Sequence, residues 1–354
     1  MKKKNIKLGS FKLTNNSAPY IIAEIGVNHE CSIKLAKKMI DQACSGGAHA
    51  VKFQTYKAEK IAAKKSPFYW DLSEEKTKSQ YELFKKYDQF EFKDYLLLQK
   101  YCNKKGIDFL STPFDEDAVD KLNNLVPFFK IASADLNNFP LLEKIAKKKK
   151  TVLLSTGASN IKEIRESTNF LKKRGCTNIV LLHCILSYPT KYENANLRMI
   201  SDLIKEFPNN IIGYSDHTKP DKDMSSVISA YLLGAQVIEK HFTFNKKLKG
   251  NDHYHSMDLK DLKNLTSKIK FVKKLLGNIG SKKCIDVEKI SRKNARRSIY
   301  VKKTIKKDSK IKRNDLICKR PALGMSPKNL FNIVGKRARR EIKVEKLISK
   351  EDFY

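Results

Sequence analysis

The sequence predicts an α/β protein in which a (β/α)8 barrel is followed by a small, mostly β domain. The first observation is a set of eight short, nearly continuous apolar segments, as strands buried on both faces should be. The second is a helical pattern between them, so that eight strand–helix units fit into about 240 residues, as in a barrel of this kind. The expected strands are residues 20–26, 50–55, 108–113, 128–133, 151–157, 178–184, 210–217 and 235–242.

The helical stretches have recognisable ends. Apolar residues recur at helical spacing through 32–45, and that helix should stop at Gly46. Another should begin with a capping box formed by Ser159 and Glu163. A doubly wound open sheet is the alternative fold, and the lack of a GxGxxG fingerprint disfavours it. We interpret the long stretch 56–107 as an insertion that covers the substrate at the barrel mouth.

Composition excludes several classes of protein. The chain has 354 residues, of which 41% are hydrophobic and 31% charged, which is typical of a globular protein. No run of about 18 apolar residues predicts a membrane span. The basic start lacks an apolar segment, so we expect no signal peptide and a cytoplasmic location. The seven cysteines form no CxxC pair, so we expect reduced thiols.

The net charge of +34 raises nucleic-acid binding as an alternative function. Only 11 of the basic residues are arginines, and none precedes Arg165. Surfaces that read bases and grip phosphates favour arginine, and the lysines here lie at helix-surface spacing. We therefore predict a lysine-rich, solvated surface and no nucleic-acid partner.

The chain divides by pattern into residues 1–280 for the barrel, a polar linker at 281–294 and a second domain at 295–354. The last part consists of short β-type pieces separated by turns. A domain of this size is marginally stable alone, so we expect it to dock on another surface. A standalone binding or ice-interacting module is the alternative, and the charged stretch 302–313 disfavours a flat apolar face.

Chemistry in such a barrel lies at the carboxyl ends of the strands. Two lysines lie there within apolar strands, where an unpaired charge is costly. They either form ion pairs with Glu24 or Glu239, or join the hydroxyl side chains in binding a phosphate ester. The candidates at the strand ends are Glu24, Lys52, Gln54, Ser111, Thr112, Lys130, Ser133, Ser155, Thr156, His183, Cys184, Ser215, His217, Glu239 and His241.

Two histidines, His217 and His241, end adjacent strands about 4.8 Å apart and can reach one metal ion. Two imidazoles with open positions suit an octahedral Mn²⁺ or Co²⁺ acting as a Lewis acid better than a closed zinc site. His183 and Cys184 are possible further ligands. The loop with Asp252, His253 and His255 either contacts substrate or is a surface turn.

The strip GYSDHT, residues 213–218, places Ser, Asp and His side by side, as if for a hydrolase triad. Side chains alternate along a strand, so Ser215 and His217 share one face while Asp216 points to the other. We predict an anion-binding serine and a metal-binding histidine in place of a triad.

Ten stretches together resemble the sialic acid synthases, N-acetylneuraminate synthase and its legionaminate synthase relatives. They are IIAEIGVNHE, AVKFQTYK, FLSTPFD, FKIASAD, LLSTGAS, HCILSYPT, IGYSDHT, VIEKHFT, GNDH and, in the tail, KRPALGMSP. The tail resembles the C-terminal antifreeze-like SAF domain of that family, a β-clip fold.

The resemblance implies a metal-dependent transferase that condenses phosphoenolpyruvate with N-acetylmannosamine and water, giving a nine-carbon 2-keto sugar acid and phosphate. The alternative sugar is 2,4-diacetamido-2,4,6-trideoxymannose, which gives legionaminate. The implied cofactor is Mn²⁺, with Mg²⁺ or Co²⁺ as alternatives. The implied phosphoenolpyruvate binders are Lys52, Thr112, Lys130, Ser133, Ser155 and Ser215.

The resemblance also implies roles for other residues. His217 and His241 match the metal ligands, and we expect Glu24 to orient or deprotonate groups around the aldehyde and the water. Arg320 matches an arginine that a partner subunit offers to the sugar, which implies a homodimer with a swapped SAF domain. Asp135, Leu186 and Ala322 depart from the pattern, as Asp for Glu, Leu for Asn and Ala for Gly. The implied sugar-side residues are Glu24, Gln54, Tyr188 and Asp252, and we count Asp135 as a further substrate-binding candidate.

Overall fold

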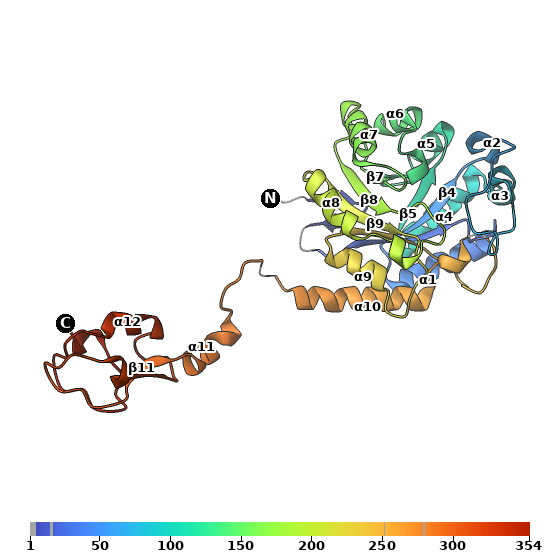
Figure 1. Ribbon diagram of the computed structural model, residues 1–354. Coiled ribbons are helices and arrows are strands. Elements are labelled where there is room, and N and C mark those ends of the chain that lie inside the picture. Colours follow the sequence, from blue (N-terminus) through green and yellow to red (C-terminus); the bar gives the residue numbers. More distant parts are fainter. Residues whose placement is uncertain (1–4, 15–16, 251, 279) are drawn as a thin grey trace. The chain divides into compact units, whose positions relative to one another are not determined.

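The computed structural model describes residues 5–14, 17–250, 252–278 and 280–354 (Figure 1). The chain separates into two compact units, 1–277 and 278–354. The second boundary predicted from the sequence, the linker at 281–294, falls inside the second unit and is partly helical: α11 spans Lys289–Ala295. Acidic residues at 286 and 288 precede this helix, where negative charge favours a helix start.

The first unit is the predicted (β/α)8 barrel. Its eight strands are parallel and follow the order β5-β4-β3-β10-β9-β8-β7-β6. The two end strands of that order, β5 and β6, contact each other, which closes the sheet. The strands are β3 (Tyr20–Gly26), β4 (Ala50–Thr55), β5 (Asp108–Pro113), β6 (Phe129–Ile131), β7 (Val152–Ser155), β8 (Ile179–Cys184), β9 (Ile211–Asp216) and β10 (Val237–His241).

Helices surround the sheet, as Figure 1 shows. The segment 56–107 is not one insertion, because its last part forms α4 (Phe92–Lys105), which packs on α1 and β5 as a barrel helix. The true insertion holds the short helices α2 (Ala58–Ile61) and α3 (Gln80–Tyr87). The other helices of this unit are α1 (Ile33–Gly46), α5 (Glu116–Leu122), α6 (Phe139–Ala146), α7 (Ile161–Lys173), α8 (Arg198–Glu206), α9 (Ser225–Leu232) and α10 (Leu259–Leu276).

Local signals explain most of the helix ends. Helix α1 ends at Gly46, and Gly47 follows it with φ +85°, a conformation that glycine adopts without steric cost. The capping box expected at Ser159 lies one residue later. Asn160 is the N-cap of α7, and its side chain and that of Glu163 bond each other's backbone N–H groups, because the box requires a spacing of three residues.

A short hairpin precedes the barrel and was not foreseen from the sequence. Strands β1 (Ile6–Leu8) and β2 (Phe11–Leu13) pair antiparallel, and Leu8 and Leu13 are part of the barrel's apolar core. Three-residue strands are too short to show a period. The structure shows that the hairpin is buried against the barrel, but no sequence periodicity predicts it.

The second unit has its own core, which confirms the predicted small β-rich domain. Strands β11 (Ser298–Val301) and β12 (Leu316–Lys319) pair antiparallel, and isolated bridges join further extended segments. The short helix α12 spans Leu330–Ile333. The buried residues are Ile299, Val301, Ile305, Ile311, Leu316, Leu330, Ile333, Ala338, Ile342 and Ile348.

All seven cysteines are free thiols. Within the described ranges, no helix is both long and apolar enough to cross a membrane.

Candidate active site

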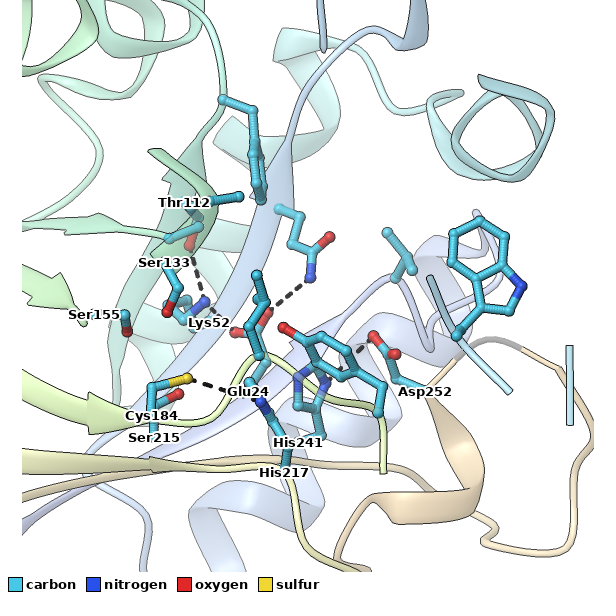
Figure 2. A pocket seen from close by; sticks show the side chains of 18 of the residues that line it. Glu24, Lys52, Thr112, Ser133, Ser155, Cys184, Ser215, His217, His241 and Asp252 are labelled. Atoms are coloured by element: carbon cyan, nitrogen blue, oxygen red, sulfur yellow. Dashed lines mark hydrogen bonds and ion pairs between the residues drawn. The ribbon is translucent and has the colours of Figure 1, made fainter. Parts of the chain in front are cut away.

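A pocket lies at the carboxyl ends of the barrel strands and holds most of the predicted site residues (Figure 2). Its open space is about 1120 Å³, part of which is continuous with solvent, so small molecules can enter it. Those predicted residues that line it are Glu24, Lys52, Gln54, Thr112, Lys130, Ser133, Ser155, Cys184, Tyr188, Ser215, His217, Glu239, His241 and Asp252.

Glu24 enters the pocket from the end of β3. The pairing of β3 with β4 shifts register between Glu24 and Gly26, and Gly26 has φ +56°. A Cβ at this glycine would come within 3.3 Å of both the Glu24 and Gln54 side chains, so glycine permits their close approach. Gln54 Nε2 donates to Glu24 Oε1 at 3.2 Å. Burial raises the pKa of Glu24 to about 7, although Lys52 opposes this shift.

Two buried lysines and two buried carboxylates form the floor of the pocket. Lys52 Nζ lies 2.6 Å from Glu24 and 3.9 Å from Glu239, and Lys130 Nζ lies 3.5 Å from Glu239. Burial lowers the pKa of Lys130; burial would also lower that of Lys52, but Glu239 and Glu24 raise it. The ion pairs considered for these lysines are therefore present, and both ammonium groups still line the pocket.

Hydroxyl groups surround the lysines. Lys52 donates to Thr112 Oγ1 at 2.8 Å, and Ser215 Oγ donates to Glu239 at 3.0 Å. Ser155 Oγ is buried and has no hydrogen-bond partner in the described part of the chain. Ammonium and hydroxyl donors with spare bonding capacity, gathered in one pocket, suit a phosphate or carboxylate group.

Strand alternation answers the question raised by GYSDHT. Asp216 points away from the pocket and is fully buried in an ion pair with Lys240 of the neighbouring strand, at 2.7 Å. His217 and His241, one residue further along each strand, line the pocket with ring centroids 5.4 Å apart. His217 Nδ1 bonds the carbonyl of Ile185 at 2.8 Å, which leaves Nε2 for a ligand. The arrangement is no hydrolase triad.

A loop after β10 completes this wall. Asp252 Oδ2 lies 3.4 Å from His241 Nδ1, and burial raises the pKa of Asp252 to about 6. His255 packs beside His241 with ring centroids 4.8 Å apart. Burial, then the neighbouring histidines His255 and His217, lower the pKa of His241 well below its usual range, so its imidazole is neutral and able to bind a metal. The donor set therefore fits a divalent cation.

The insertion supplies an apolar and aromatic wall, as expected for a segment that covers substrate. Tyr69 packs against Tyr188 with centroids 6.1 Å apart, and Trp70 Nε1 donates to the carbonyl of Thr77 at 3.1 Å. Tyr188 also packs on His217 at 4.2 Å. The apolar and aromatic residues on this side of the pocket are Ile61, Tyr69, Trp70, Leu83, Phe84, Leu186 and Tyr254.

Two residues to which the resemblance gave a substrate-binding role, Asp135 and Arg320, do not line this pocket, and neither do the strand-end candidates Ser111, Thr156 and His183. Asp135 accepts a hydrogen bond from Asn138 Nδ2 at 3.0 Å, in the turn that leads into α6. Arg320 is an exposed residue of the second unit. His183, considered as a metal ligand, faces away and bonds the carbonyl of Ala195 at 2.9 Å, whereas Cys184 lines the pocket.

Glu239, named from the sequence only as a strand-end residue and a partner for lysine, lies at the centre of the charged network. The pocket residues of the insertion were not named individually, because nothing in their spacing marks which side chains turn inward. The periodicity of β10, which places Glu239 on the same face as His241, was the available signal for Glu239.

The fold and this pocket are those of a (β/α)8-barrel enzyme with groups suited to an anion and to a cation at the mouth of its barrel. The chain belongs to the NeuB family, whose model matches residues 39–281, and a SAF domain matches residues 296–353. It is therefore a sugar acid synthase of that family, as its sequence motifs predicted.

Relatives with assigned names agree. The chain is 40% identical to N,N'-diacetyllegionaminic acid synthase of Campylobacter jejuni, over 93% of this chain and 98% of that protein. It is 38% identical to the enzyme of the same name from Legionella pneumophila, over 94% of each chain. The structure of N-acetylneuraminic acid synthetase from Leptospira borgpetersenii matches with a TM-score of 0.73 and 34% identity, covering 82% of this chain and 95% of that one.

Proposed function

We propose that this protein condenses phosphoenolpyruvate with an N-acetylated sugar aldehyde and water, releasing phosphate and a nine-carbon 2-keto sugar acid. The observation that carries the proposal is the buried group of Lys52, Lys130 and Ser155 beside His217 and His241. The first three offer donors to an anionic substrate, and the histidines offer lone pairs to a cation. Groups suited to the anionic substrate and groups suited to the cation thus lie in one pocket.

The lysines and hydroxyls would hold the phosphate and carboxylate of phosphoenolpyruvate. In the reaction, its C3 attacks the sugar aldehyde and forms the new carbon–carbon bond, which leaves positive character at C2. Water adds at C2, and phosphate leaves with cleavage of its C–O bond. A bound divalent cation, Mn²⁺ being the first candidate with Mg²⁺ and Co²⁺ as alternatives, would act as a Lewis acid toward the aldehyde oxygen.

Glu24 is suited to proton transfer. Its carboxyl lies at the junction between Lys52 and Gln54, and its pKa of about 7 allows it to change protonation near neutral pH. As the carboxylate it would accept a proton from the attacking water. Gln54 fixes its orientation through the 3.2 Å hydrogen bond.

The sugar itself is a choice between two candidates. The motifs of the sequence put N-acetylmannosamine first. The apolar wall of Ile61, Leu83 and Leu186, however, offers few partners to hydroxyl groups and suits a 6-deoxy sugar with a methyl group. The two named legionaminate relatives, at 40% and 38% identity, favour the same choice. We therefore propose 2,4-diacetamido-2,4,6-trideoxymannose as the preferred substrate.

Arg320 would act from a partner subunit. It lies exposed in a small unit with a separate core, so a homodimer that exchanges the second units could bring it to the N-acetyl group of the sugar. The matching arginine of the resembling family supports this part of the proposal.

Phosphate release from phosphoenolpyruvate tests the function. The purified chain is incubated with phosphoenolpyruvate, Mn²⁺ and either sugar, and the two sugars are then set in competition. We expect a higher kcat/KM with the diacetamido sugar. If neither sugar nor any other N-acetylated mannose-type aldehyde releases phosphate, the proposed function is wrong; a preference for N-acetylmannosamine overturns only the choice of sugar.

A further inference from the structure

His255 is a buried imidazole that lacks a hydrogen bond among the described residues. Its side chain has 0% exposure, and neither ring nitrogen forms a hydrogen bond in the described part of the chain. A neutral imidazole carries one N–H donor and one lone pair. Buried polar groups are normally paired, so this one requires an explanation beyond packing.

Two polar side chains of the same wall, Asp252 and His241, lie close to His255. Asp252 Oδ1 lies 3.8 Å from His255 Nε2, and Asp252 Oδ2 lies 3.4 Å from His241 Nδ1, which is itself buried without a hydrogen bond. One ligand atom from each of the three residues lies within 4.8 Å of the others. The three side chains therefore converge, and no hydrogen bond joins them in the described part of the chain.

These distances distinguish between a hydrogen-bonded network and a ligand shell. Both exceed the range of good hydrogen bonds. Two donors that each lie about 2.1 Å from one metal ion are about 3.0–3.4 Å apart at octahedral or tetrahedral angles. Small adjustments of the Asp252 and His255 side chains would bring the three donors onto one ion.

The local backbone explains why these two loop residues face His241. A 3₁₀ turn spans His253–His255 and follows Asp252 directly. In this geometry residues three apart lie one above the other, so Asp252 and His255 share a side. His253 points elsewhere: its Nδ1 lies 2.7 Å from Thr243 Oγ1 and its Nε2 lies 3.3 Å from Glu30. The loop thus provides one histidine turned toward the pocket wall and one turned away.

We propose that His255 is a protein ligand of the divalent cation, together with His241 and Asp252. The proposal rests on the proposed function only for the presence of a cation. With His217 on the pocket side, the ion would have three imidazoles and one carboxylate, and an octahedral ion would keep two positions for substrate oxygens. An imidazole-rich shell favours Co²⁺ or Zn²⁺ over Mg²⁺.

The test is metal binding by the full chain after removal of metals with a chelator. Co²⁺ is titrated into the parent protein, His255→Phe and His253→Gln, and its visible absorption gives the affinity. His255→Phe keeps an aromatic ring but no ring nitrogen, and His253→Gln is the matched control on the same turn. Pulsed electron paramagnetic resonance of bound Cu²⁺ or Mn²⁺ then counts the coordinated imidazole nitrogens. Circular dichroism confirms that each variant is folded, and His255→Ala replaces the Phe variant if that one is not.

We expect Co²⁺ affinity to fall by about 10–100-fold or more in His255→Phe, the range seen when groups supporting a metal site are lost, and to stay unchanged in His253→Gln. The parent should show one more coordinated imidazole than His255→Phe. A lower affinity with an unchanged imidazole count would assign His255 an orienting role and overturn the proposal. So would equal affinity in His255→Phe and the parent.

These outcomes are separate from the fate of the proposed function. A parent protein that binds Co²⁺ through His255 and releases no phosphate with any sugar retains the cation site and loses the synthase assignment. A parent protein that turns over phosphoenolpyruvate, with His255→Phe binding Co²⁺ equally well, retains the synthase assignment and loses His255 as a ligand.

Discussion

Replacing Lys240 with methionine should destabilise the barrel strongly. Its ammonium group lies 2.7 Å from Asp216 Oδ2 and 2.6 Å from the carbonyl of Thr218, and both charged side chains have 0% exposure. Removal of one partner from a buried ion pair leaves an uncompensated charge and costs about 3–5 kcal/mol. Asp216 keeps hydrogen bonds from Tyr214, Thr218 and Ser226, so we expect the lower end of that range.

The assay is thermal unfolding followed by circular dichroism. About 3 kcal/mol corresponds to a fall in Tm of about 6–12 °C for a unit of roughly this size. Lys268→Met is the matched control, because Lys268 forms a 2.6 Å ion pair with Asp223 in which the side chains are 32% and 69% exposed. Exposed pairs contribute about 0–1 kcal/mol, so this variant should melt close to the parent.

Two further measurements sharpen the test. The double variant Asp216→Asn with Lys240→Met removes both charges and should recover most of the lost stability. Burial would raise the pKa of Asp216, but Lys240 and the surrounding hydrogen bonds hold it below its usual value. In the parent, this stabilisation is present above the unfolded pKa of an Asp and is lost as pH falls through the folded pKa.

In Lys240→Met the pKa of Asp216 rises, so the deficit relative to the parent should be largest at neutral pH and shrink in acid. A Tm for Lys240→Met as high as that of Lys268→Met would refute the reasoning. A deficit that does not change with pH would show that lost packing, and not the bare carboxylate, is responsible.

Four other outcomes follow from the same structure. Lys52→Met removes the ammonium group bonded to Glu24 and Thr112. The kcat/KM for phosphoenolpyruvate, measured by phosphate release, should then fall by about 10²–10³-fold. The control Lys268→Met, at a residue outside the pocket, should leave kcat/KM unchanged. Because burial raises the pKa of Glu24 to about 7, kcat/KM should rise with pH through that value as the carboxylate forms. Glu24→Gln should lose both the activity and this rise of kcat/KM with pH. A Gln variant with the parent's pH profile would exclude Glu24 as the base. Arg320→Ala should raise KM for the sugar and leave Co²⁺ affinity intact, whereas an unchanged KM would remove Arg320 from the site. The protein should give no gel shift with DNA or RNA at ~150 mM salt; a shift with steep salt dependence there would restore nucleic-acid binding as a function.

The barrel and most of the strand-end residues were predictable because both depend on short-range patterns. Strands buried on both faces are continuous apolar runs, and alternation then fixes which residues face the pocket. Lys52 and Lys130 stood out for this reason: each is a charge within an apolar run, and each lines the pocket. The strand bounds agreed to within two residues at each end, with β3, β4 and β5 identical.

Residues outside the strands were less predictable, because no period governs them. Asp252 and His255 face one way and His253 another only because a 3₁₀ turn forms there. Asp135 occupied a strand-end motif, yet β6 ends at Ile131, and the next residues form a turn that directs its carboxylate to Asn138. The second unit was recognisable by composition. The position of Arg320 relative to a partner subunit's pocket cannot be predicted from any local sequence pattern.

The charge balance of the pocket explains how the two lysines can stay buried when no anionic substrate is bound. Lys52 and Lys130 face Glu24 and Glu239, so equal numbers of opposite charges are buried together, which limits the cost of desolvation. An incoming phosphate must compete with these carboxylates for the lysines. Glu24 is the weaker competitor, because burial has already raised its pKa to about 7, whereas Lys130 and Lys52 together hold the pKa of Glu239 below its usual value despite burial. Glu239 therefore keeps both lysines in position, and Glu24 is the carboxylate that can exchange a proton near neutral pH.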